Sequence, residues 1–129
     1  MNFTSKSRRP KWRSVLVLGV LMLGATAAMQ GLRAWSQARL GPQVAALAKP
    51  GDIFMIASET CTYCAKARTW FEANRVPFGE CLIERDAYCA AQYNALLAPG
   101  TPVLLVRGKR LLGFNAQALA DALDTPAPS

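Results

Sequence analysis

Two cysteines lie three residues apart in the segment Cys61-Thr62-Tyr63-Cys64, shortly after the apolar run Ile53–Ala57. A cysteine pair with this spacing, at the end of a strand and the start of a helix, suits reversible dithiol–disulfide chemistry. The free N–H groups and the dipole of a helix N-terminus stabilise the thiolate of the first cysteine. The second cysteine follows one turn later, close enough to attack a mixed disulfide formed on the first. We therefore interpret Cys61 as the nucleophile and Cys64 as the cysteine that resolves the mixed disulfide.

The net charge of +7 at pH 7 is concentrated near the start of this 129-residue chain. Residues 1–49 hold eight Lys or Arg and no acidic residue, whereas residues 50–129 hold seven Lys or Arg and eight Asp or Glu, a net charge of −1. The sequence has no histidine, which excludes Cys–His catalysis and histidine metal ligands. Nucleic-acid binding would need basic residues clustered on the folded part. The cluster of Arg107, Lys109 and Arg110 is interpreted instead as a solvated hairpin, and no nucleic-acid partner is expected.

A basic segment precedes a long uncharged run near the N-terminus. Residues 1–13 contain five Lys or Arg, and the 19 residues Ser14–Leu32 that follow carry no charge. An α-helix crosses a bilayer with about 20 apolar residues, and Trp12 and Trp35 stand where interfacial aromatic residues are expected. The basic excess before the run predicts a cytoplasmic N-terminus and a periplasmic domain at a bacterial inner membrane.

The uncharged run has a second interpretation. Ala25-Thr26-Ala27 has the small-x-small pattern of a signal-peptide cleavage site, so residues 14–32 are either a transmembrane signal anchor or a cleaved signal peptide. Both interpretations place the remaining chain in the periplasm. Residues 33–50 are expected to form a linker, residues 51–124 the folded domain, and residues 125–129 a flexible tail.

The folded domain shows alternating strand and helix patterns, and its fold class is therefore α/β. The order βαβαββα, with two parallel strands followed by a hairpin, predicts one four-stranded mixed sheet with helices on its faces. Strands are expected over Asp52–Ala57, Phe78–Glu84, Val103–Val106 and Arg110–Leu112, and the last two are joined by a turn at Gly108-Lys109. Helices are expected over Thr62–Asn74 and Asp86–Leu97, and a last helix is expected after a cap at Asn115.

This order and its motifs resemble the glutaredoxin branch of the thioredoxin-like superfamily over about residues 52–124. The stretch Glu59–Cys64 is similar to the glutaredoxin active-site stretch, with Thr62 where proline is usual. Thr101-Pro102-Val103 looks like the cis-proline segment of that family, and Gly113-Phe114-Asn115 looks like the turn before its last helix. The resemblance implies a thioredoxin-like fold and a thiol–disulfide oxidoreductase activity that needs no cofactor.

The resemblance also implies which residues face the substrate. A cis bond before Pro102 would present the Thr101 backbone to an extended thiol substrate beside Cys61, whereas a trans proline at a strand start is the alternative. Substrate-binding residues are then expected at Thr62, Tyr63, Thr101, Pro102, Val103 and Gly113.

Three departures from the glutaredoxin pattern concern the partner. Glutaredoxins commonly carry a lysine shortly before the cysteine pair and an acidic residue after the glycine turn, and both hold glutathione. Ser58 and Asn115 stand at these places here, and Thr101 stands where valine is usual. Glutathione is therefore a doubtful partner. Protein disulfide substrates and a membrane or periplasmic electron partner are expected instead.

Two further cysteines, Cys81 and Cys89, lie in the second predicted strand and the second predicted helix. Cys89 shares an apolar stripe with Tyr93, Leu96 and Leu97, so the two cysteines can meet across the strand–helix contact. In an oxidising compartment we expect a structural disulfide between them. A second redox relay and two free thiols are the alternatives.

The spacing of the four cysteines, C-x2-C-x16-C-x7-C, does not match the two closely spaced thiol pairs of structural zinc sites. No metal is expected. The sequence therefore predicts a membrane-tethered periplasmic thiol–disulfide oxidoreductase. The alternative is a non-catalytic tethered thiol or metal-binding module in cytochrome or copper-site assembly.

Overall fold

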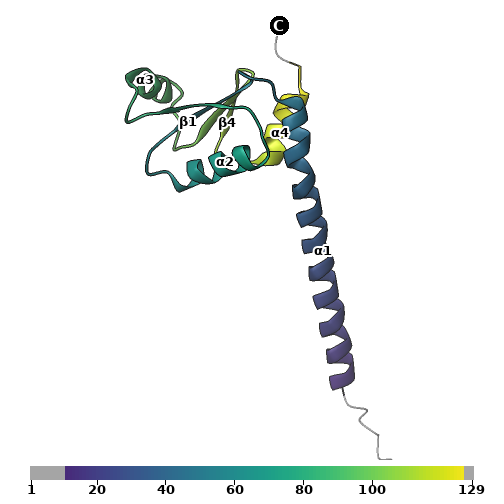
Figure 1. The fold of residues 1–129 in the computed structure, drawn as a ribbon. Helices are drawn as coiled ribbons and strands as arrows, with labels where there is room; N and C mark the ends of the chain where they lie inside the picture. Colours follow the sequence, from purple (N-terminus) through teal and green to yellow (C-terminus); the bar gives the residue numbers. More distant parts are fainter. Residues whose placement is uncertain (1–10, 127–129) are drawn as a thin grey trace, which may run out of the picture. The chain divides into compact units, whose positions relative to one another are not determined.

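Figure 1 shows a computed structural model of the chain, which describes residues 11–126. The chain divides into two units, Met1–Ser36 and Gln37–Ser129. The first unit contains most of α1, a helix of 36 residues over Trp12–Leu47. The apolar part of α1 has a mean hydropathy of 2.0, and α1 is long and apolar enough to cross a membrane. A signal sequence near an N-terminus has the same length and composition. Most of the predicted basic segment, residues 1–10, lies outside the described residues.

Helix α1 continues through most of the segment predicted as a linker. Residues 33–47 are helical although Pro42 lies inside them, and a short connection leads from Leu47 to the first strand. Proline removes one helix hydrogen bond, but Leu40 and Val44 are buried in the core of the second unit. This burial favours the helix, so the linker expected over residues 33–50 is corrected to a helix that joins the folded domain at Gln37.

One four-stranded sheet forms the centre of the second unit. Its strands are β1 (Ile53–Ala57), β2 (Gly79–Leu82), β3 (Val103–Val106) and β4 (Lys109–Leu112), in the order β2-β1-β3-β4. β1 and β2 run parallel, whereas β1 with β3 and β3 with β4 run antiparallel. The predicted fold class is therefore confirmed.

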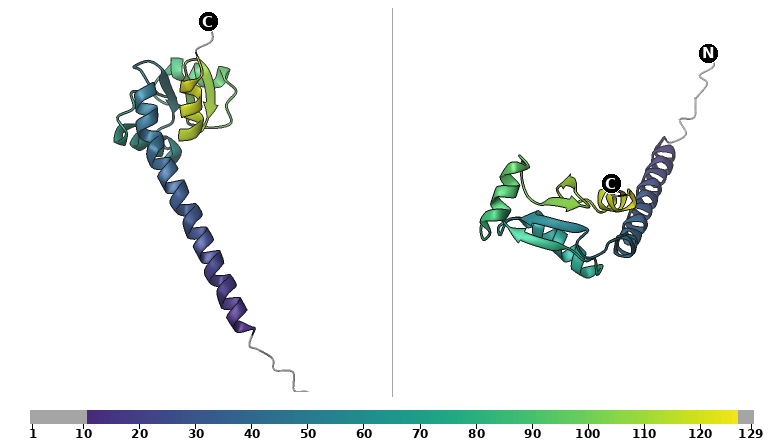
Figure 2. Two further views of the ribbon diagram at one scale, coloured as in Figure 1. Left: turned by 90° about the vertical axis from the view of Figure 1, so that its right-hand side faces the viewer. Right: turned by 90° about the horizontal axis from the view of Figure 1, so that it is seen from above.

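Alternate residues of the central strands face two separate cores, because successive strand side chains point to opposite sides of a sheet. Helices α2 (Thr62–Ala73) and α4 (Ala116–Asp124) and the end of α1 cover the larger core, which includes Met55, Phe71 and Leu104. Helix α3 (Ala87–Ala95) covers the smaller core of Ile56, Cys89 and Val103. Figure 2 shows α4 beside the end of α1, with α3 apart from both.

Two local predictions need correction. Leu97 was expected on the apolar stripe of α3, but α3 ends at Ala95 and Leu97 has a φ of 49°. This left-handed conformation turns Leu97 out of the helical face, and its side chain is 88% exposed. The hairpin turn is formed by Arg107 and Gly108, both with positive φ, and Lys109 already belongs to β4. Two positive φ values are typical of a type I′ turn.

Arg107 also differs from the solvated hairpin residue that was expected. Its guanidinium donates to the carbonyl oxygen of Leu47 at 3.2 Å, to that of Leu123 at 2.6 Å and to the Asp52 carboxylate at 2.9 Å. The hydrogen bond from Arg107 holds the pKa of Asp52 below its ordinary value. One half-buried arginine therefore joins the ends of α1 and α4 to the start of β1.

Candidate redox site

Cys61 caps helix α2. It has extended backbone angles, φ −80° and ψ 106°, and the backbone N–H of Cys64 donates to its Sγ at 3.1 Å. Cys61 is half-buried, Cys64 is fully buried, and the two form a disulfide with a Cα–Cα distance of 5.2 Å. The first sulfur thus lies at the positive end of the helix, where a thiolate is stabilised after reduction.

The predicted cis-proline segment lies at the same edge of the sheet as Cys61. The Thr101–Pro102 bond is cis, as predicted. β1 and β3 are antiparallel with Ile56 opposite Val103, so the residues that precede β3 lie beside the residues that follow β1. The N–H of Gly113 donates to the Pro102 carbonyl oxygen at 2.9 Å. The structure thereby brings Thr101, Pro102, Val103 and Gly113 together beside the segment that leads to Cys61.

The predicted substrate-binding residues differ in how far their side chains are exposed to solvent. Pro102 and Val103 are buried, whereas Thr101 and Gly113 are half-buried. Thr62 and Tyr63, between the two cysteines, are exposed, and Tyr63 is 68% exposed. The Lys66 Nζ lies 5.3 Å from the centre of the Tyr63 ring, a cation–π distance. Thr62, Tyr63 and Thr101 are thus the predicted site residues with exposed or half-exposed side chains.

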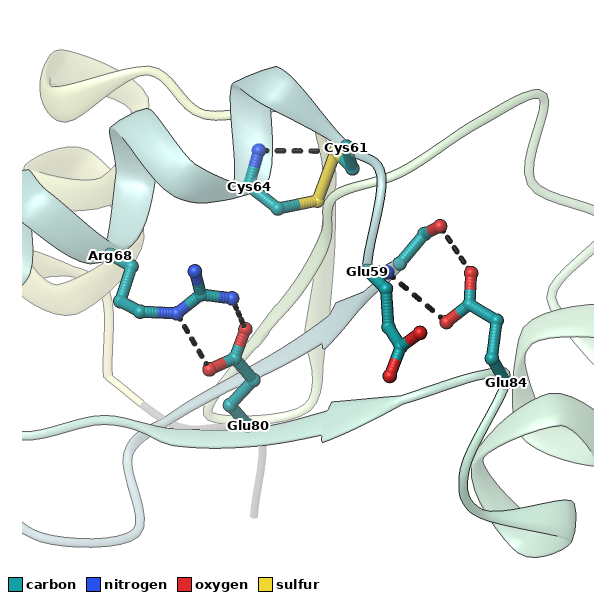
Figure 3. The surroundings of a disulfide bond; sticks show 7 residues. Glu59, Cys61, Cys64, Arg68, Glu80 and Glu84 are labelled. Atoms are coloured by element: carbon teal, nitrogen blue, oxygen red, sulfur yellow. Dashed lines mark hydrogen bonds and ion pairs between the residues drawn. A yellow bond between two sulfur atoms is a disulfide. The ribbon is translucent and has the colours of Figure 1, made fainter.

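Glu84 is a residue of the site that the sequence analysis missed. Figure 3 shows its carboxylate against the turn that precedes Cys61. The Ser58 hydroxyl donates to one Glu84 oxygen, and the Glu59 N–H donates to the other at 3.2 Å. Arg85 donates in turn to the Glu59 carboxylate. The Ser58 hydrogen bond lowers the pKa of Glu84, because it stabilises the charged carboxylate.

A sequence signal for Glu84 existed. Its segment follows β2, which runs parallel to β1, and the carboxyl ends of parallel strands meet at one edge of a sheet. Ser58 follows β1 and Glu84 follows β2, so the two residues could have been placed together. A second pair, Arg68 of α2 with Glu80 of β2, joins the helix to the same strand further from the turn (Figure 3).

Cys81 and Cys89 form a disulfide with a Cα–Cα distance of 6.0 Å. It joins β2 to the buried face of α3, where Cys89 is 1% exposed. The surrounding smaller core includes Phe54, Ile83 and Tyr93. This disulfide pairing agrees with the expected one, and the role of the pair remains a prediction.

Comparisons with known proteins found similarity to one sequence family and to solved structures. The sequence model of the glutaredoxin family matches residues 53–111. The crystal structure of a mutant of the thioredoxin-like protein BC3987 is similar with a TM-score of 0.52 and 21% identity, over 57% of this chain and 96% of that chain. A glutaredoxin from Archaeoglobus fulgidus has a TM-score of 0.48 and 18% identity, over 57% of this chain and 87% of its own. No match to a curated protein is found.

The match to the family model includes the cysteine pair, the cis-proline segment and three of the four strands in full. The similarity to the thioredoxin-like protein supports the fold independently. The fold and the Cys61–Cys64 pair are those of thiol–disulfide oxidoreductases in general. The second unit of this chain thus has a thioredoxin-like fold, and its residues 53–111 match the glutaredoxin family model.

Proposed function

We propose that this protein is a membrane-tethered periplasmic thiol–disulfide oxidoreductase that acts on protein or small thiol substrates. The observation that carries the proposal is the Cys61–Cys64 disulfide at the N-terminus of α2. Cys61 is the nucleophile, and Cys64 attacks the mixed disulfide to release the reduced substrate and re-form the Cys61–Cys64 bond. In the reducing direction, two electrons and two protons pass from the dithiol to the substrate disulfide, and an electron partner must reduce the Cys61–Cys64 bond again. The same steps in reverse oxidise a substrate dithiol, and the proposal leaves both directions open.

We expect protein or peptide disulfides to be better substrates than glutathione. Ser58 and Asn115 stand where the family carries charged contacts to glutathione, and both side chains are already engaged. The Ser58 hydroxyl donates to Glu84, and the Asn115 Oδ1 accepts the Ala118 N–H at 3.0 Å as the cap of α4. A hydrogen bond to a charged group contributes about 1.5–3 kcal/mol, so the loss of two such contacts should weaken glutathione binding severely.

Exchange assays on the full-length protein in detergent test this proposal. The reduced protein should transfer electrons to a peptide disulfide much faster than to a glutathione mixed disulfide. Efficient turnover with glutathione would show that other residues provide the missing contacts. No exchange with any disulfide, together with one bound zinc or copper ion per chain, would support the tethered metal-binding alternative instead.

The periplasmic location is supported by the apolar helix α1 and by the basic excess before it. Alkaline phosphatase fused after Ser129 should be active, because this reporter needs an oxidising compartment to form its disulfides. An inactive fusion beside an active cytoplasmic reporter at the same position would contradict the location. Retention of full-length protein in the membrane fraction distinguishes an anchor from a cleaved signal peptide.

A further inference from the structure

The turn between β1 and α2 determines where the Cys61 sulfur lies. β1 ends at Ala57, the Cys61 N–H donates to the Ser58 carbonyl oxygen at 3.3 Å, and Cys61 then caps α2. Three residues, Ser58, Glu59 and Thr60, thus connect a buried strand to the nucleophile. A displacement of this turn would move Cys61 relative to the N–H groups at the start of α2, which stabilise its thiolate.

The polar groups at the start of this turn are bound to one carboxylate. The Ser58 hydroxyl and the Glu59 N–H each donate to a different oxygen of Glu84, 25 or 26 positions later in the chain. The next residue, Arg85, pairs with the Glu59 side chain. The segment of residues 84–85 therefore binds the first two residues of the turn through three polar contacts.

Glu84 is itself held within a covalently closed loop. The Cys81–Cys89 disulfide closes the chain around residues 82–88. Inside the loop, the N–H groups of Arg85 and Asp86 both donate to the Leu82 carbonyl oxygen, at 3.1 and 3.0 Å. The N–H of Ile83 donates to the Ala57 carbonyl oxygen at 3.0 Å, which fixes the start of the loop to the end of β1. The loop therefore has little freedom to carry Glu84 away from the turn.

We propose that Glu84 is a positioning residue for the nucleophile Cys61, and that the Cys81–Cys89 disulfide acts on the redox pair by holding Glu84 in place. This inference rests on the proposed function, because it concerns how the nucleophile is kept reactive. This role requires no contact of Glu84 with the sulfur or with the substrate. Its effect passes through Ser58 and Glu59 to the position of Cys61.

Two substitutions distinguish an effect of Glu84 on the position of Cys61 from an effect of the negative charge of Glu84. Glu84→Ala removes both hydrogen bonds and the charge. Glu84→Gln removes the charge alone, because its carboxamide can accept the Glu59 N–H and donate to the Ser58 hydroxyl, which then acts as an acceptor. Loss of a nearby negative charge lowers the pKa of a thiol, whereas displacement from the helix N-terminus raises it. The two effects therefore have opposite signs.

The experiment measures the pH dependence of Cys61 alkylation by iodoacetamide in the full-length Cys64→Ser variant, whose Cys61 is the one free thiol. Glu84→Ala should raise the pKa of Cys61 by about half a unit to one unit and slow alkylation near neutral pH several-fold. Glu84→Gln should leave the pKa unchanged or slightly lowered. Glu80→Ala is the matched control, since it removes a carboxylate of β2 that pairs with Arg68 and not with the turn. Circular dichroism checks that each variant is folded.

The disulfide is tested by a double-mutant cycle in the same background. Cys81→Ala with Cys89→Ala should also raise the pKa of Cys61, and adding Glu84→Ala should raise it no further. Equal shifts in the two Glu84 variants, or an equal shift in the Glu80 control, would overturn the positioning role. Additive shifts from the disulfide and from Glu84 would overturn the proposed coupling. Alkylation needs no turnover, so these results stay readable even if the protein fails to exchange disulfides.

Discussion

The two cysteine pairs of this domain contain the same chemical groups in different surroundings. Cys61 and Cys64 are three residues apart within one helix start, with the first sulfur half-buried beside exposed Thr62 and Tyr63. Cys81 and Cys89 are eight residues apart and join a strand to a helix across the smaller core. Each pair has one half-buried and one buried cysteine, and Cys89 lies in the first turn of α3. The pairs differ because Cys61 caps α2 beside the exposed Thr62 and Tyr63, whereas Cys81 lies within β2.

On the expected roles of the two pairs, the place in the fold, and not the residue type, separates a redox pair from a structural disulfide. A helix N-terminus lowers the pKa of a thiol and makes it reactive. Burial in an apolar core raises the pKa and limits access by an attacking thiolate. The comparison predicts different behaviour of the two pairs in three experiments, and a fourth experiment tests the contact between Ser58 and Glu84.

Substitution of single cysteines should give the largest difference. Cys61→Ser should abolish exchange, because the thiol that remains in the pair, Cys64, is fully buried and a substrate disulfide cannot reach it. Cys64→Ser should trap substrates as mixed disulfides on Cys61, because the resolving thiol is missing. Non-reducing gels followed by mass spectrometry measure the trapped species. Equal trapping by the two variants would contradict the assigned roles.

The second largest difference should be the ease with which the two disulfides are reduced. Mild reductant should release two thiols per chain first, and peptide mapping after alkylation should place them at Cys61 and Cys64. We expect the Cys81–Cys89 bond to be at least about tenfold harder to reduce at equilibrium, a difference of about 30 mV. Release of Cys81 and Cys89 first, or of all four thiols together, would remove the distinction between the pairs.

The Cys81–Cys89 disulfide should contribute more to the stability of the fold than the Cys61–Cys64 disulfide, although it should contribute less to exchange. Cys81→Ala with Cys89→Ala opens a nine-residue loop, for which chain entropy gives a loss of about 2.5 kcal/mol. The matched change at Cys61 and Cys64 opens a four-residue loop and should cost less, about 2 kcal/mol. Denaturant unfolding measures both. If the first variant kept the fold but lost all exchange activity, the second pair would be an electron relay and not a structural disulfide.

The smallest effect concerns the Ser58–Glu84 hydrogen bond, which joins the turn before Cys61 to the loop closed by the Cys81–Cys89 disulfide. The Ser58 hydrogen bond lowers the pKa of Glu84 in the folded state. This contact therefore stabilises the fold above the unfolded pKa of about 4.3 and loses its effect as the pH falls through the lower folded pKa. The difference in free energy of unfolding between the wild type and Glu84→Ala should therefore shrink as the pH falls through the folded pKa of Glu84. A difference that stays constant from pH 7 to pH 3 would contradict this origin.

Local signals in the sequence predicted much of the site. The cysteine pair, the proline after Thr101 and the cap at Asn115 each have a short pattern with a direct structural meaning, and the structure has the corresponding features. The order of strands and helices in the second unit followed from periodicity, since β1 and β3 are apolar and α2 and α4 each have a buried face.

Features that depend on contacts between distant segments were not predicted. Glu84 meets Ser58 across 26 positions, and Arg107 meets Leu47 across 60. Glu84 could be placed beside Ser58 only through the parallel pairing of β1 and β2. No comparable signal marks the contacts of Arg107, which was therefore assigned to a solvated hairpin. Residues 33–47 are helical because Leu40 and Val44 gain burial in the domain, and this gain overrides the break that Pro42 would otherwise favour.

The participation of α1 in the domain core determines how a soluble fragment should be designed. A fragment beginning at Gly51 would keep the region matched by the glutaredoxin family but would lose Leu40, Val44 and the Leu47 carbonyl that Arg107 binds. Burial of one such aliphatic side chain contributes about 1.5–3 kcal/mol, a large part of the stability of a small domain. A fragment beginning at Gln37 retains these groups and omits the apolar run. The last three turns of α1 thus belong to the minimal folding unit, and the gene fragment to express is longer than the family match suggests.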